Sequence, residues 1–170
     1  MPRSLQAWYS RNDLELLADR GTVVSGELRV SKLTRLDGLA HADRSGTIAV
    51  TLAAERGTAG RLLLTLALRG TLVVTCQRCL EPFDWKVDER VAWLIVDADS
   101  EAAGLDGVEP VLALDEGRLS VEGLLEDELI VALPMAPRHE TVDACGPLAQ
   151  NLSAVLSDSG TDQVVGSRDV

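Results

Sequence analysis

Two cysteines lie three positions apart in the stretch TCQRCLEPF, and they are the residues of this sequence best suited to chemistry. Cys76 and Cys79 form a C-x-x-C pair, and this spacing lets two thiolates in one tight turn bind the same metal ion. A structural zinc site needs four Cys or His ligands, and the remaining candidates are His41, His139 and Cys145. A Cys₃His zinc site would consist of Cys76, Cys79, His139 and Cys145.

The same residue types allow other interpretations. Without a metal, the three thiols would be partly buried structural groups, and His139 would fix its loop through a hydrogen bond to a backbone carbonyl. Redox catalysis needs the first cysteine of the pair at a helix N-terminus, where the dipole lowers its pKa. This pair instead joins two predicted strands. A Cys–His hydrolase would need a third, orienting residue, and no such pattern stands out.

Alternating apolar and polar residues predict the strands that position the cysteine pair. Strands are expected at 23–31 and 47–54 and, most clearly, at 62–76 and 83–95, where apolar residues fall on even and then on odd positions. The last two predict a long hairpin with the C-x-x-C pair in its turn. Gly70 is expected to mark a bulge or a bend. Residues 5–17 predict a short helix or turn.

A helix is expected after Ser120, a suitable N-cap, and Pro134 ends it. The acidic segment 97–117 reads as an exposed loop. The sequence therefore predicts an α+β fold, a mostly antiparallel sheet with a C-terminal amphipathic helix packed on it. We expect one domain over residues 1–146 and a flexible, acidic and polar tail over 147–170.

Charge divides the chain into two unlike parts. Residues 1–96 carry a net charge of +2 and residues 97–170 carry −13, which together give the total of −11. An acidic C-terminal half repels a phosphate backbone and suits a basic protein partner. The longest apolar runs are too short to cross a membrane, and the N-terminus lacks a signal sequence pattern, so we expect a cytoplasmic protein.

Two sequence blocks carry a resemblance to a known family. They are VTCQRCLEPF (74–83) and LLEDELIVALPMAPRH (124–139), with Cys145 following. Over roughly residues 60 to 146 the chain resembles the YceD family, named for large-subunit ribosomal RNA accumulation. The resemblance implies a bacterial or plastid-type factor whose loss lowers the level of that RNA. It implies no reaction.

The expected function is therefore a non-enzymatic factor that supports large-subunit ribosomal RNA accumulation and ribosome biogenesis. Its expected partner is a basic ribosomal or processing protein, or a pre-ribosomal particle, with any RNA contact confined to the N-terminal half. A thiol-dependent enzyme and a direct RNA-binding module remain the alternatives. Glu126 and Asp127 are expected on a solvated helix face, and Glu128 is expected to pair with an arginine such as Arg78. The candidate partner-binding residues are Arg78, Glu126, Asp127 and Glu128.

Overall fold

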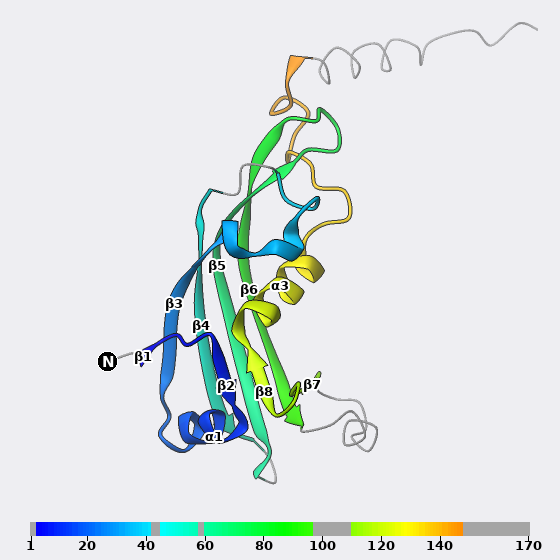
Figure 1. The fold of residues 1–170 in the computed structure, drawn as a ribbon. Coiled ribbons are helices and arrows are strands. Elements are labelled where there is room, and N and C mark those ends of the chain that lie inside the picture. The colour runs from blue at the N-terminus through cyan, green and yellow to red at the C-terminus, as the bar shows by residue number, and fades with distance from the viewer. Residues whose placement is uncertain (1–2, 42–44, 58–59, 97–109, 148–170) are drawn as a thin grey trace, which may run out of the picture.

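The structure is a computed structural model that describes residues 3–41, 45–57, 60–96 and 110–147. Its main sheet has six strands in the order β1-β3-β4-β5-β6-β7 (Figure 1). The four central strands pair antiparallel, and the short strands β1 and β7 pair parallel at the two ends. The expectation of a mostly antiparallel sheet is confirmed. The strands are β1 (Arg3–Ser4), β3 (Val23–Arg29), β4 (Thr47–Arg56), β5 (Leu62–Thr75), β6 (Pro82–Val96) and β7 (Val111–Ala113).

A second, two-stranded sheet connects the N-terminal segment to the C-terminal helix. In it β2 (Trp8–Ser10) pairs antiparallel with β8 (Arg118–Ser120). Helix α1 (Arg11–Asp19) follows β2, and helix α3 (Val121–Ala132) follows β8. Two 3₁₀ turns, η1 (Val30–Lys32) and η2 (Thr34–Leu36), lie between β3 and β4.

Strands β5 and β6 form a long hairpin whose turn carries the cysteine pair. The even-numbered leucines of β5 are all buried, because alternate residues of a strand point to the same face. A bulge or a bend was expected at Gly70, and the bulge is wrong, because the pairing keeps one register from Leu63 opposite Leu94 to Thr75 opposite Pro82. Pairing with β4 ends at Gly70, opposite Ile48, and the hairpin continues beyond it as a two-stranded arm.

Gly70 allows β4 to lie close to the hairpin. A Cβ atom there would lie 2.7 Å from the carbonyl oxygen of Thr47 and 2.8 Å from Cδ1 of Ile48. A larger residue would therefore push β4 away from β5. The absent side chain, and not a bulge, explains the glycine.

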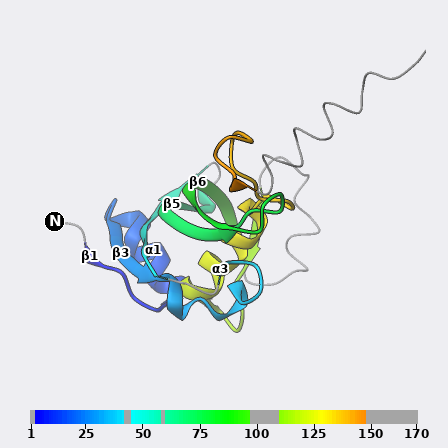
Figure 2. The ribbon, with the colours of Figure 1, turned by 90° about the horizontal axis from the view of Figure 1, so that it is seen from above.

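Helix α3 lies on the concave face of the curved sheet (Figure 2). Leu124, Leu125 and Leu129 are buried and belong to the same apolar cluster as the inward leucines of β5. Ser120 caps the helix, because its hydroxyl accepts a 3.1 Å hydrogen bond from the N–H of Gly123. Helix α3 is therefore held at its first turn and along its apolar face.

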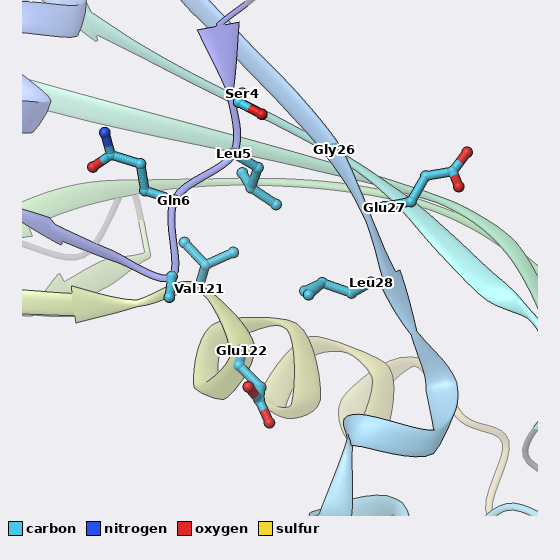
Figure 3. A pocket seen from close by; sticks show the side chains of 9 residues that line it. Ser4, Leu5, Gln6, Gly26, Glu27, Leu28, Val121 and Glu122 are labelled. Atoms are coloured by element: carbon cyan, nitrogen blue, oxygen red, sulfur yellow. The ribbon is translucent and has the colours of Figure 1, made fainter.

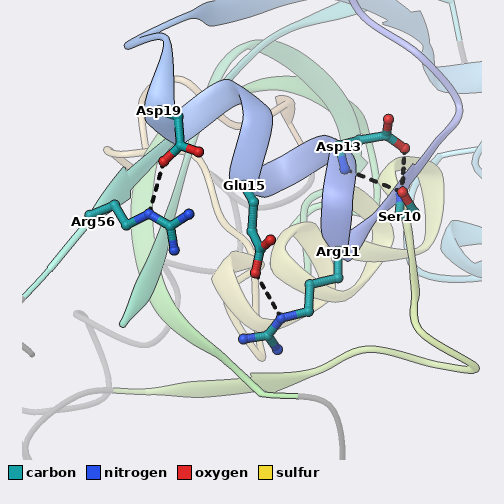
Figure 4. A network of polar contacts seen from close by, with 6 residues as sticks. All are labelled: Ser10, Arg11, Asp13, Glu15, Asp19 and Arg56. Carbon is teal, nitrogen blue, oxygen red and sulfur yellow. Dashed lines mark hydrogen bonds and ion pairs between the residues drawn. The ribbon is translucent and has the colours of Figure 1, made fainter. Parts of the chain in front are cut away.

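Helix α1 begins with a capping box, shown in Figure 4. The Ser10 hydroxyl accepts from the Asp13 N–H at 3.2 Å, and the Asp13 carboxylate accepts from the Ser10 N–H at 2.9 Å. Arg11 pairs with Glu15 within the helix, and Asp19 pairs with Arg56 of β4. The Asp19–Arg56 pair fixes α1 against β4, at the end of the sheet that is remote from the cysteines.

Short strands account for most differences from the sequence-based expectation. The segment read as an exposed loop over 97–117 contains β7, and the N-terminal segment contains β1 and β2 besides its helix. The predicted tail, apart from Pro147, and the first part of that loop lie outside the described residues. No helix in the described part of the chain is long and apolar enough to cross a lipid bilayer.

Candidate metal centre

The hairpin turn holds Cys76 and Cys79 in one tight bend. The N–H of Cys76 donates to the carbonyl of Glu81 at 2.9 Å, and the N–H of Leu80 donates to the carbonyl of Cys76 at 2.8 Å. Leu80 has a φ of 62°, in the left-handed region that closes such turns. Both sulfurs consequently face the same side of the turn.

The segment after α3 brings the other two candidate ligands to this turn. Pro134 prevents the helix from continuing, and the chain then runs without regular secondary structure toward the hairpin. The N–H of Gln77 donates to the carbonyl of Pro137 at 2.8 Å, and the Arg78 guanidinium donates to the carbonyl of His139 at 3.2 Å. The two segments are therefore joined by their own hydrogen bonds next to the cysteines.

All four predicted ligand residues meet at this point. The three sulfurs and the imidazole nitrogen of His139 lie within 4.8 Å of one another. The Nδ1 atom of His139 is 3.5 Å from the sulfur of Cys79 and 3.5 Å from that of Cys145. Zinc bonds of about 2.3 Å to sulfur and 2.0 Å to nitrogen, at tetrahedral angles, place sulfur and nitrogen about 3.5 Å apart. The two sulfur–nitrogen distances fit a zinc ion.

The surroundings favour a thiolate at Cys76. Burial opposes ionisation of its sulfur, but the backbone N–H groups of His139, Cys79 and Arg78 point at it and lower the pKa of this thiol to about 5. The N–H of Arg78 lies 3.4 Å from the sulfur. Burial and the neighbouring thiols of Cys79 and Cys76 instead raise the pKa of Cys145 to about 11. A bound cation would relieve the cost of ionising this crowded set.

Two neighbours orient the histidine. The ring of Phe83 lies 4.7 Å from the His139 ring, at an angle of 37°. Arg78 holds the His139 backbone from the opposite segment. Neither positioning role follows from a sequence pattern, although Phe83 and Arg78 both belong to the block VTCQRCLEPF. His41 is outside the cluster, and its N–H donates to the carbonyl of Val73 on the arm.

The acidic residues of α3 lie differently from the expectation. Glu126 is only 5% exposed and accepts a 2.9 Å hydrogen bond from the N–H of Arg35, so its expected position on a solvated face is wrong. The neighbouring Asp127 is about half exposed and forms an ion pair with the Arg35 side chain. Helix α3 thus uses both carboxylates to hold the turn η2.

Glu128 does not pair with Arg78 among the described residues. Burial and the nearby carboxylates of Asp127 and Glu89 raise its pKa instead. The guanidinium of Arg78 instead donates to the carbonyl of His139, beside the cysteine cluster. A partner-binding role for these residues stays a prediction.

A cavity of about 320 Å³ lies at a distance from the cysteines, between the N-terminal segment, β3 and the start of α3 (Figure 3). The apolar side chains of Leu5, Leu28 and Val121 face one another across it, whereas the carboxylates of Glu27 and Glu122 point away. The cavity gathers no set of reactive groups. It is a gap in the packing where the N-terminal segment passes over β3 at Leu5.

Comparisons with known proteins agree with the sequence blocks around the metal centre. The YceD family model, described as "Large ribosomal RNA subunit accumulation protein YceD", matches residues 64–164. A curated relative of that name from Haemophilus influenzae is 34% identical over 67 residues, which are 39% of this chain and 38% of the relative. No solved structure matches the chain. Because the family match covers more than half of the sequence and includes all four candidate ligands, the chain belongs to the YceD family.

Proposed function

We propose that this protein is a non-enzymatic factor that supports accumulation of large-subunit ribosomal RNA in the cytoplasm. Its membership of a family described by that role is the observation that carries the proposal. The match with the named relative covers 38% of that relative's length, so the role rests on the shared region alone. The region matched by the family model, residues 64–164, contains the hairpin arm, helix α3 and the Cys₃His cluster.

Within this function, the cluster serves as a structural zinc site formed by Cys76, Cys79, His139 and Cys145. Structural zinc sites use four protein ligands and leave no position open for substrate. Cys76 is fully buried and Cys145 is 3% exposed, which supports a closed site. The ion would join the hairpin arm to the segment that follows α3, and so give the tip of the molecule one fixed shape for a partner.

The partner is a basic ribosomal or processing protein within a pre-ribosomal particle. The charge of −13 on residues 97–170 supports this choice, since complementary charge speeds association and directs orientation. Exposed carboxylates in the described part of this half include Glu122, Asp127 and Glu140. Binding should weaken as salt screens these charges.

The test is a strain in which the gene for this protein has been deleted. The ratio of large- to small-subunit ribosomal RNA should fall, and the wild-type gene should restore it. A Cys79→Ser gene should restore it poorly, because the tip would lose its shape. An unchanged ratio in the deletion strain would reject the function.

Binding is tested separately by capture of pre-ribosomal particles at increasing salt. The variant Glu122→Gln/Asp127→Asn/Glu140→Gln should capture less than the wild type, whereas Glu55→Gln, an exposed acidic residue of β4, should not differ. Capture that is indifferent to salt and to the triple variant would reject electrostatic docking. A thiol-dependent enzyme is the alternative, and it predicts that Cys76→Ser abolishes turnover without lowering the melting temperature.

A further inference from the structure

Strand β6 has a long backbone edge with no partner among the described residues. Strand β7 pairs with it only from Leu94 to Val96. On that edge the N–H of Leu94 donates to Pro110, while the carbonyl of Glu81 faces β5 and accepts from Cys76. In an antiparallel strand, the N–H and C=O groups of successive residues point alternately to the two sides. The even-numbered residues of β6, like Leu94, therefore point these groups away from β5. Within the described chain, no hydrogen bond satisfies the outward backbone groups of Asp84, Lys86, Asp88 and Arg90.

The side chains of these four residues form an alternating row of charges. All four are exposed on the face opposite the core. When two copies of β6 run antiparallel about a two-fold axis at Val87, Asp84 faces Arg90 of the second copy. Lys86 then faces Asp88 of the second copy. Every facing pair is opposite in charge, which favours cross-strand pairing.

Neighbouring registers of the same strand pair bring like charges together. Centring the axis on Lys86 brings the two Lys86 residues together and sets Asp84 against Asp88. Centring it on Asp88 brings the two Asp88 residues together and sets Lys86 against Arg90. Shifts by one residue would place outward backbone groups against inward ones. The charges therefore select the register centred on Val87.

The surface beside this edge is hollow. A cleft of about 500 Å³ is lined by four consecutive residues of β6, Phe83 to Lys86, and across from them by Arg138, His139, Glu140 and Ala144. Successive side chains of a strand point to opposite faces, so a cleft that touches four in a row lies along the strand edge. It lies where the partner's residues 88–91 would pair.

We infer that the protein forms a two-fold dimer through antiparallel pairing of β6 with β6 of a second copy, centred on Val87. Four facing pairs, each exchanging two bonds, add about eight backbone hydrogen bonds and make one continuous sheet. The edge ends at Pro82, which lacks an N–H group. The contact is isologous, so each charged position takes part in two symmetry-related facing pairs.

The test measures the mass of the full-length protein by sedimentation over a range of concentrations. Asp84→Arg and Arg90→Asp should each raise the dissociation constant by at least about tenfold, because each reverses two facing pairs. Neither Asp84 nor Arg90 has an ion pair within the described chain, whereas Asp88 already pairs with Arg69. The melting temperature of each variant serves as a folding control.

Charge exchange makes the test specific. The double variant Asp84→Arg/Arg90→Asp should dimerise like the wild type, and the two single variants should form a heterodimer when mixed. A third variant, Lys86→Pro, removes one outward N–H without removing a bond to β5 and should also weaken the dimer. A wild-type chain that stays monomeric, or a dimer that both single variants leave intact, would overturn the proposal.

Discussion

The backbone N–H of Gln77 donates a 2.8 Å hydrogen bond to the carbonyl of Pro137, which joins the hairpin turn to the segment after α3. The Arg78 guanidinium adds a second link to the same segment at His139. Neither contact depends on a metal. The cluster is therefore arranged in advance, and an ion that binds there would have less chain to order.

Replacing a ligand should remove the metal and lower stability. For Cys145→Ser we expect zinc to fall from about one ion per chain to well below that, because three ligands bind less tightly than four. We expect the free energy of unfolding to fall by about 2–3 kcal/mol, which would lower the melting temperature by about 5–10 °C. Elemental analysis and thermal unfolding measure both quantities.

Glu140→Gln is the matched control, because it changes an exposed side chain next to His139 and leaves all four ligands in place. A chelator should lower the melting temperature of this control and of the wild type, but not that of Cys145→Ser. Wild-type protein that contains no zinc after purification without chelator would contradict the metal site.

Adjacent carboxylates of α3 should differ in their importance for stability. Glu126→Ala leaves the partly buried N–H of Arg35 without its acceptor and removes a buried side chain, and we expect it to cost about 1–3 kcal/mol. Asp127→Ala removes an ion pair between half-exposed side chains, and we expect it to cost about 0–1 kcal/mol. Urea unfolding of the two variants gives the comparison. Equal losses would contradict the assigned hydrogen bond.

The contribution of the α1 cap to the stability of the fold should depend on pH. The side-chain hydrogen bond from Ser10, followed by its backbone N–H, lowers the pKa of Asp13. A carboxyl group with a lowered folded pKa stabilises the fold above its unfolded value of about 4, and this stabilisation is lost as the pH falls through the folded value. Ser10→Ala should therefore cost about 1 kcal/mol at pH 7 and less near pH 3. Denaturant titrations of the wild type and Ser10→Ala at both pH values measure the difference in unfolding free energy. The same difference at both pH values would contradict a contribution from the Asp13 carboxylate.

Glu128 should weaken the fold at neutral pH. Burial and the carboxylates of Asp127 and Glu89 raise its pKa, so the ionised form is disfavoured in the folded protein. Glu128→Gln should stabilise the protein by a few tenths of a kcal/mol at pH 7, and the gain should disappear below the unfolded pKa of about 4. Glu122→Gln, in the first turn of the same helix, should instead destabilise it slightly, because the helix dipole favours that charge.

Long strands were predictable because their burial follows the sequence period. Every even position of β5 from Leu62 to Leu68 is buried, as the alternation requires. Strands β1, β2, β7 and β8 have two or three residues each, too few for a period to show, and distant partners decide their pairing. Residue type reduced the cluster to five candidates, three cysteines and two histidines, and the place of His139 between helix α3 and Cys145 favoured it over His41.

The burial of Glu126 could not be predicted from the sequence pattern. Its place in an acidic run predicted solvent, but a backbone N–H from η2, far away in sequence, lies over that face of α3 and draws the carboxylate inside. No local pattern contains that information. The charge row of β6 was visible in the sequence, but its meaning required knowing which edge of the strand is unpaired.

The end of β4 opposite Gly70 divides the hairpin into two regions with different surroundings. On the side of this point away from the cysteines, β5 lies between β4 and β6. On the cysteine side, within the described part of the chain, β5 pairs only with β6, and its Val73 carbonyl accepts one further bond from His41. The outer region should therefore open as a separate cooperative unit, with amide protons that exchange faster than those of the inner region. Protection of amides that bond to β6 in the outer region, such as that of Val74, would then report on the state of the cysteine cluster, while that of Thr65 would report on global unfolding.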